Sequence, residues 1–411
     1  MAYLDRNRTQ TLLQEAKLDA LILFSPESFY YATGAHAGVA TMWRKAGAVA
    51  ALVPALASDE EMAVVSDLFA PDFYRNSHIN DVRISPIWVE TTTLEVSDTN
   101  ANAFQLVDDA WNKAGRKPGF ERPSTFDPTI CFTHIADALA EKGLTNARIG
   151  VEADAMTMPE YTQLTKALPG TTLSDASQVV ARLKMVKCDE EIQHLRDAVT
   201  LAEQGIRAIQ QSIRMGITRN ELAEVWQQAI AQHQGDKSLS STWEYISVGS
   251  NPWGGNAKVN AHDLVKVDVG CVVNGYTSDT GRTYVMHKPT EVQLSLFNAL
   301  MAGFTTGSAL LQPGVKLSHI HAATQTAIRD AGFPAYTRGH FGHGLGASVG
   351  SEQWPFISAD SQVELEPGMV LAFECPWYIN GLGGMIIENQ VLITRDGHEM
   401  MNTLNTDLVC C

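Results

Sequence analysis

Five side chains in the last third of the 411-residue chain have the types and spacing to bind divalent metal ions: Asp268, Asp279, His343, Glu374 and Glu388. Four carboxylates and one imidazole carry more negative charge than a single divalent ion neutralises, so we expect two ions. Bridging carboxylates can hold such ions about 3.5 to 4 Å apart, and a water shared between them becomes a hydroxide at neutral pH. That hydroxide would be the nucleophile of the reaction.

Four of the five residues lie beside sequence runs that predict strands. Asp268 ends the run 264–267, which has the character of a buried strand, and Asp279 follows eleven residues later on an expected neighbouring strand. Glu374 and Glu388 are fourteen residues apart, each at the edge of a β-like run. That spacing suits a hairpin.

His343 lies in the glycine-rich segment 342–346, where small residues would let the backbone approach whatever the imidazole binds. Each ligand taken alone also has an ordinary structural explanation. Asp268 could end a strand, and Asp279 could pair with Arg282 in a turn. His343 could be a hydrogen-bonded core histidine. Five such coincidences in order favour a metal site over these readings.

The elements that must position these residues fall into two domains, as the length of the chain predicts. Residues 1–182 alternate helical and strand patterns, which predicts an α/β domain. Residues 183–411 open with a long helix from Asp189 that has apolar residues at steps of three and four. Thr218 and Thr290 each begin a capping box, which predicts two further helices.

Composition argues against several classes of protein. Hydrophobic residues make up 45% and charged residues 18% of the chain, as in ordinary globular proteins. The net charge of −16, without any basic block, argues against a nucleic-acid partner. No apolar run is long enough to span a membrane, and residues 1–8 carry charges where a secretory signal needs an apolar core. The six cysteines form no CxxC pair, so we expect no disulfide framework and a cytoplasmic location.

The ligands also lie in motifs that occur together in a known family. The motifs are Asp268-x-Gly270, the segment 275–283, the segment 342–346, Glu374-x-Pro376 and Ile387-Glu388-Asn389. Together they resemble the pita-bread metallohydrolases, which include methionine aminopeptidase, Xaa-Pro aminopeptidase, prolidase and creatinase. The resemblance implies an α+β fold, with a pita-bread catalytic domain over residues 183–411. A creatinase-like N-terminal α/β domain would precede it over residues 1–182.

The resemblance further implies a role for each ligand. Asp268 would bind one ion, His343 and Glu374 would bind the other, and Asp279 and Glu388 would bridge the two. Glu374 would also assist proton transfer as a general base. The two ions could be manganese, cobalt, zinc or iron, because the ligand types do not choose among them. The family also implies a homodimer in which the N-terminal domain of one subunit helps to wall the site of the other.

Several residues differ from those that face the substrate in Xaa-Pro peptidases. The histidine expected before the first aspartate is missing from the segment 249–253, and Gly350 stands where a second histidine is expected. Ile386 replaces the arginine expected two positions before Glu388. His340 is a candidate to take over a catalytic role, with a hydrogen-bonded structural histidine as the alternative.

Aromatic side chains suggest how a substrate could be bound. Four tryptophans are candidate substrate-binding residues: Trp43, Trp253, Trp354 and Trp377. Their faces suit sulfonium or quaternary ammonium groups through cation–π attraction worth up to about 2 kcal/mol, and core packing is the alternative for each. Trp253 and the segment 352–355 look similar to the dimethylsulfoniopropionate lyase branch of the family. That branch has acids where this chain has Gly270 and Val349.

These observations predict a dinuclear metal-dependent hydrolase of the Xaa-Pro dipeptidase or aminopeptidase type. Its metal-bound hydroxide would attack an amide C–N bond in a short peptide or small molecule. The alternative is a family member that acts on a small onium or amide metabolite, like dimethylsulfoniopropionate lyase or hydrolases of ectoine or creatine. A binding module without chemistry is a third hypothesis, and the complete ligand set argues against it. No nucleic-acid or membrane partner is expected.

Overall fold

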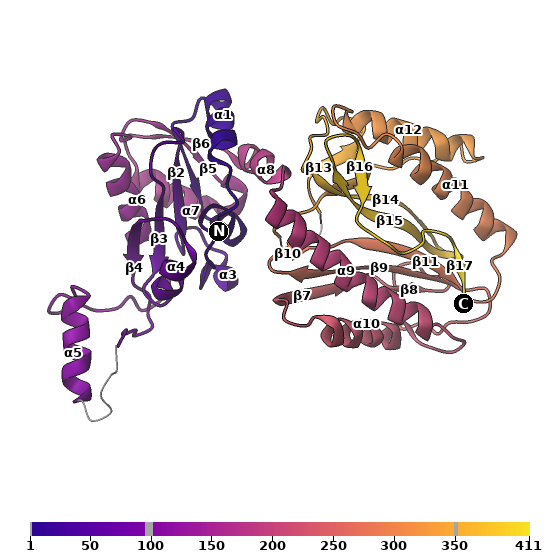
Figure 1. Ribbon diagram of the computed structural model, residues 1–411, viewed down its shortest axis with the longest axis horizontal. Helices are drawn as coiled ribbons and strands as arrows, with labels where there is room; N and C mark the ends of the chain where they lie inside the picture. The colour runs from indigo at the N-terminus through magenta and orange to yellow at the C-terminus, as the bar shows by residue number, and fades with distance from the viewer. Residues whose placement is uncertain (1, 95–101, 349–351) are drawn as a thin grey trace. The chain divides into compact units, whose positions relative to one another are not determined.

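The computed structural model describes residues 2–94, 102–348 and 352–411 (Figure 1). The chain forms two compact units, Met1–Leu183 and Lys184–Cys411. This division lies beside the domain boundary expected between residues 182 and 183. Within the described ranges, no helix combines the length and the apolar character needed to cross a membrane.

The N-terminal unit is an α/β structure around a six-stranded mixed sheet in the order β4-β3-β2-β1-β5-β6. Its strands are β1 (Ala20–Leu23), β2 (Ala50–Pro54), β3 (Met62–Ser66), β4 (Asp81–Ser85), β5 (Arg148–Val151) and β6 (Thr172–Asp175). Its helices are α1 (Arg6–Ala16), α2 (Pro26–Thr33), α3 (Ala40–Trp43), α4 (Ala70–Asn76), α5 (Ala103–Lys113), α6 (Thr129–Glu141), α7 (Met158–Ala167) and α8 (Ser177–Met185). Every residue of β1, β2 and β3 is buried, as expected for strands covered on both faces.

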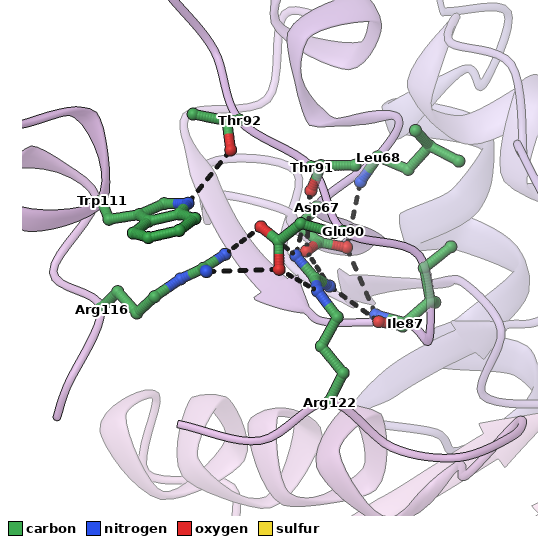
Figure 2. A network of polar contacts seen from close by, with 9 residues as sticks. All are labelled: Asp67, Leu68, Ile87, Glu90, Thr91, Thr92, Trp111, Arg116 and Arg122. Atoms are coloured by element: carbon green, nitrogen blue, oxygen red, sulfur yellow. Dashed lines mark hydrogen bonds and ion pairs between the residues drawn. The ribbon is translucent and has the colours of Figure 1, made fainter. Parts of the chain in front are cut away.

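A network of ion pairs ties the segment around α5 to the rest of this unit (Figure 2). The Arg122 guanidinium donates to Asp67 Oδ2 at 2.7 Å and to Glu90 Oε2 at 3.0 Å. Arg116 donates to Glu90 Oε1 at 2.6 Å. The bonds from Arg116 and Arg122 lower the pKa of Glu90 to about 2. Because no residue of α5 is buried, these polar contacts stabilise the segment in place of an apolar core.

Replacing Arg122 with methionine should loosen the segment around α5. Methionine keeps the apolar stem but removes the donors that connect Asp67 with Glu90, at a cost of roughly 0.5 to 1 kcal/mol. We expect faster backbone hydrogen exchange over residues 103–122. Arg75→Met is the matched control, because it removes only the exposed pair between Arg75 and Asp72 on α4. Equal exchange rates in the two variants would contradict the role given to the network.

The C-terminal unit is built on an eleven-stranded sheet with the main order β10-β9-β11-β15-β14-β12-β13. Its strands are β7 (Leu239–Glu244), β8 (Ser247–Val248), β9 (Leu264–Val273), β10 (Tyr276–Thr277), β11 (Thr280–Val285), β12 (His340–Gly344), β13 (Gln353–Ser358), β14 (Val370–Ile379), β15 (Gly383–Ile393), β16 (His398–Met400) and β17 (Val409–Cys410). Along the main order the pairings are antiparallel. Glu374 and Glu388 lie opposite each other in the β14–β15 hairpin, which confirms the hairpin predicted from their spacing.

Four helices cover this sheet in two pairs: α9 (Asp189–Ser212) with α10 (Arg219–His233), and α11 (Glu291–Ser308) with α12 (Leu317–Asp330) (Figure 1). The predicted capping boxes at Thr218 and Thr290 begin α10 and α11. Residues 265, 267 and 269 of β9 join the core beneath α9 and α10. Residues 371, 373 and 375 of β14 join the core beneath α11 and α12. The side chains of the residues between these, on both strands, therefore point out of the opposite face of the sheet.

Candidate metal centre

Three of the predicted ligands lie in one row across neighbouring strands of the C-terminal sheet. Asp268 on β9 is opposite Gly281 on β11. Gly281 is in turn opposite Glu388 on β15, and Glu388 is opposite Glu374 on β14. Directly opposed residues of antiparallel strands point to the same side. The three carboxylates of this row therefore project from the face of the sheet that the helices do not cover.

The other two ligands join this row through the alternation of strand residues. Asp279 lies two positions before Gly281, directly ahead of β11. His343 on β12 is opposite Ala372, which lies two positions before Glu374 on β14. Residues two apart on a strand share a face, so Asp279 and His343 project to the side of the three carboxylates. The sheet thus brings all five predicted ligands to one face.

Asp279, His343 and Glu388 form the tightest part of this cluster. One ligand atom of each lies within 4.8 Å of the others, and all three residues are buried. The Asp279 Oδ2 and His343 Nε2 atoms are 3.5 Å apart. Asp279 Oδ1 and Glu388 Oε2 are buried without a hydrogen-bond partner. Two buried carboxylate oxygens without donors are costly unless a cation meets them, so this donor set fits a divalent ion.

A backbone contact orients the His343 ring. Its Nδ1 lies 3.1 Å from the Gly344 carbonyl oxygen. A carbonyl only accepts, so Nδ1 is the donor, and in the neutral ring that can bind a metal the lone pair is then on Nε2. Nε2 is the nitrogen that faces Asp279. The side chain is therefore presented as a metal ligand, because ligating histidines commonly donate their second nitrogen to a carbonyl or carboxylate.

The remaining two predicted ligands are paired with cationic side chains that the sequence analysis did not single out. Lys266 Nζ lies 2.9 Å from Asp268 Oδ2, and the Lys266 side chain is only 2% exposed. Arg338 donates to Glu374 Oε1 at 2.7 Å. His340 Nδ1 also approaches Glu374 Oε1, at 3.7 Å.

Burial dominates the electrostatics of the cluster. It raises the pKa of Asp279 and of Glu388 well above the usual range, and neighbouring carboxylates, including Asp268 and Glu374, raise both further. Burial also raises the pKa of Asp268, although the Lys266 ammonium opposes the shift. These directions follow from placing like charges together in a medium of low dielectric. The cluster needs positive charge to hold its carboxylates ionised.

The glycines around His343 make room for neighbouring strands. Gly342 has a φ of +135°, and a Cβ added there would lie 2.0 Å from the Ala372 carbonyl oxygen. A Cβ at Gly344 would lie 2.7 Å from the Trp354 carbonyl oxygen. From the sequence, these small residues were expected to leave space for whatever the imidazole binds. The structure fills it with the backbone of β14 and β13, which position the histidine from both sides.

The four tryptophans have different surroundings. Trp253 is 71% exposed and stacks on Tyr378 with ring centroids 4.4 Å apart. Tyr378 lies four positions after Glu374 on β14, so it shares the face of the ligands. Trp377 lies on the other face and packs edge-on against Phe333 and Tyr336 in the core beneath the helices.

Trp354 is half-buried and packs against the same core. Trp43 belongs to the N-terminal unit, where its ring lies 5.2 Å from that of Trp88. Of the four, the structure places Trp253 beside the face that carries the ligands. Gly350 and Val349, where the chain departs from family patterns, lie outside the described residues.

Ile386 occupies the position at which an arginine is expected. It is 1% exposed, and its side chain lies 2.8 Å from where a Cβ on Gly281 would stand. Arg338, which precedes β12, instead brings a guanidinium to the cluster through Glu374. The positive charge missing at 386 is therefore present, but it comes from another element.

Comparison with known families matches both units. Residues 6–186 match the Creatinase/Prolidase N-terminal domain, and residues 193–395 match Metallopeptidase family M24. The chain joins a creatinase/prolidase N-terminal domain to an M24 metallopeptidase domain. The predicted fold is confirmed: a creatinase-like α/β domain precedes a pita-bread domain with a curled antiparallel sheet. Membership of this family implies a divalent metal, and the buried Asp279, His343 and Glu388 group is its candidate site.

Named relatives of this M24 protein include peptidases. "Putative dipeptidase YkvY" of Bacillus subtilis is 27% identical over 278 residues, which cover 67% of this chain and 76% of that protein. The Xaa-Pro dipeptidase from Bacillus anthracis is 20% identical, with a TM-score of 0.75 and 99% of each chain covered. Dipeptidase PepE from Mycobacterium ulcerans is 23% identical, with a TM-score of 0.73 and coverage of 98% and 96%. At these identities the two solved structures establish a shared fold.

Asp279→Asn should remove metal binding while leaving the fold intact. Asparagine has the same shape but loses the charge that the buried, unpartnered oxygen of Asp279 directs at the cation. We expect affinity for Mn²⁺, measured by calorimetry, to fall at least roughly tenfold. Without metal, the melting temperature should not fall, because the substitution removes a carboxyl group that burial and neighbouring carboxylates already disfavour in its charged form. Asp360→Asn, on an exposed carboxylate that accepts from Ser358, is the control, and equal affinities in the two variants would contradict the assignment.

Proposed function

We propose that this protein is a metal-dependent dipeptidase or aminopeptidase that cleaves Xaa-Pro bonds in short peptides. The observation that carries the proposal is the buried group of Asp279, His343 and Glu388, with two carboxylate oxygens that lack a donor, in an M24 domain. The relatives named as dipeptidases support a peptide substrate over other amides. Acidic and basic side chains around the metal site would accept and donate the protons of the reaction.

Glu374 is the proposed general base. A bound divalent ion would polarise the substrate carbonyl and lower the pKa of a water molecule. Arg338 and His340 both approach Glu374 at Oε1, which leaves Oε2 to take up a proton. The charge-assisted bond from Arg338 also fixes the orientation of the carboxylate. Glu374 is therefore a catalytic candidate in addition to a ligand candidate.

His340 is the proposed proton donor to the leaving amine. The Gly342 N–H lies 3.4 Å from His340 Nδ1, so Nδ1 accepts and Nε2 carries the proton of the neutral ring. Burial lowers the pKa of His340, although the neighbouring Glu374 charge opposes the shift. A neutral imidazole can donate its Nε2 proton to the leaving amine while Nδ1, which faces Glu374 Oε1, takes up a proton in exchange.

An onium metabolite fits this site less well than a peptide. The stack of Trp253 on Tyr378 offers an aromatic face, which favours a cationic ligand. However, Lys266 Nζ already lies 5.0 Å from the centre of the Tyr378 ring. A second cation on that ring would be repelled by the first. None of the three relatives reported above is named as a lyase.

Substrate turnover tests the proposal. The purified protein, reconstituted in turn with Mn²⁺, Co²⁺, Zn²⁺ and Fe²⁺, should release free proline from Xaa-Pro dipeptides. Matched dipeptides without proline, dimethylsulfoniopropionate and small amides such as creatine and ectoine serve as comparison substrates. Release of an alkene from the onium compound, or cleavage of a small amide with the dipeptides untouched, would overturn the peptidase assignment.

Glu374→Gln should reduce turnover far more than metal content. Glutamine keeps the size of the side chain and a hydrogen-bonding oxygen but cannot accept the proton, so we expect kcat to fall by about 10² to 10⁴. Metal content, measured by elemental analysis, should stay near that of the wild type. Glu364→Gln, on an exposed residue, is the control. A parallel loss of metal and rate would make Glu374 a ligand without a role as base.

The proposal includes a cytoplasmic homodimer, as the family resemblance implies. The six cysteines are all free thiols, which supports a reducing compartment. Sedimentation of the purified protein and localisation of the tagged chain in cells would test these two points separately from catalysis.

A further inference from the structure

Strand geometry fixes Lys266 inside the ligand cluster. Lys266 and Asp268 are two positions apart on β9, and such residues leave a strand on the same face. The Lys266 stem packs over Gly384, where an added Cβ would lie 3.2 Å from Lys266 Cδ. The ammonium lies between the Tyr378 ring and Asp268 Oδ2. With only 2% of the Lys266 side chain exposed, its charge is almost completely removed from solvent.

Arg338 supplies a second fixed cation on the other side of the cluster. Its guanidinium donates to Glu374 Oε1 and also to the His340 carbonyl oxygen, so two contacts hold it. The Arg338 side chain is 21% exposed, and that of Glu374 is 9% exposed. Arginine cannot lose its proton in a protein, so this charge is permanent. Each of the two outer carboxylates, Asp268 and Glu374, therefore has its own cation from the chain.

The charges of the cluster then leave room for one divalent ion. Its four carboxylates are Asp268, Asp279, Glu374 and Glu388, and His343 is presented as a neutral ligand. Two chain cations against four carboxylates leave two negative charges, which a single divalent ion neutralises. Two divalent ions would leave the buried cluster with excess positive charge, which is as costly to bury as excess negative charge. With Lys266 and Arg338 counted, the charge of the five candidate ligands no longer requires two ions.

We propose that the centre binds one divalent ion, on Asp279, His343 and Glu388, and that the Lys266 ammonium replaces a second ion at Asp268. This inference rests on the proposed function, because it specifies how many ions that metal centre uses. Arg338 plays the corresponding part for Glu374, which stays outside the ion's ligand set. The two unpartnered oxygens belong to Asp279 and Glu388, the same residues that the single ion would contact.

Metal stoichiometry tests the proposal. Wild-type protein should retain one equivalent of Mn²⁺ by elemental analysis and native mass spectrometry, with the resolved hyperfine spectrum of an isolated manganese(II) ion. Lys266→Met keeps the buried stem but removes the charge, and it should bind a second equivalent and show the broadened spectrum of a coupled pair. Lys288→Met, on an exposed lysine, is the matched control and should behave as the wild type. Two equivalents in the wild type, or one in folded Lys266→Met, would overturn the proposal.

A second variant keeps the test decisive if Lys266→Met does not fold. Asp268→Asn removes a ligand from a two-ion centre but not from the one-ion centre proposed here. It should therefore retain one equivalent, whereas Asp279→Asn should retain none. Loss of the ion from Asp268→Asn would overturn the inference while leaving metal-dependent hydrolysis in place. A wild-type protein that binds no divalent ion would overturn the proposed function as well.

Discussion

Four carboxylates gathered on one face of one sheet, three of them on buried residues, set the main constraint on this molecule. Burial raises the pKa of Asp279, Glu388 and Asp268, so the cluster loses its charge unless cations stand close by. The chain contributes some of that positive charge through Lys266 and Arg338. In the proposed metal centre a bound divalent ion supplies the rest. The proposed number of ions and the proposed role of Glu374 both follow from how this charge is balanced.

The sheet carries this constraint through its register. Glu388 is directly opposite Glu374 on β14 and Gly281 on β11. A slip of one residue would turn Glu388 toward the helix-covered core and bring Ile387 or Asn389 to the site. Close packing resists such a slip, because Gly342 lies against the β14 backbone where no side chain fits. The four helices that cover the sheet, α9 to α12, thus serve the site indirectly, because they hold the strands in register.

Much of the fold, and the gathering of the five candidate ligands on one face of the sheet, could be predicted from the sequence. The capping boxes at Thr218 and Thr290 and the Glu374 to Glu388 hairpin are local patterns, in which spacing alone indicates structure. The five candidate ligands were recognisable because their motifs resemble a known family, and all five lie within the residues that match Metallopeptidase family M24. Asp268, however, lies inside β9 and not at its end.

The partners of the ligands were harder to predict. Arg338 reaches Glu374 only because β12 pairs with β14, a contact between distant parts of the chain. Lys266 left a signal that could have been used: it interrupts the otherwise apolar run 264–267 two positions before a ligand, so it must share that ligand's face. The sequence does not tell whether a tryptophan is exposed or buried: Trp377 packs in the core, whereas Trp253 is exposed and stacks on Tyr378.

The order of the strands has a consequence for how the protein folds. No single hairpin carries Asp279, His343 and Glu388, which are brought together only when β11 pairs with β15 and β12 pairs with β14. Such pairings close long loops and form slowly. A metal ion therefore has no complete site in the early, partly folded chain and cannot direct its assembly. It would act at the end, as a clamp that slows the opening of a finished sheet and lengthens the lifetime of the native state.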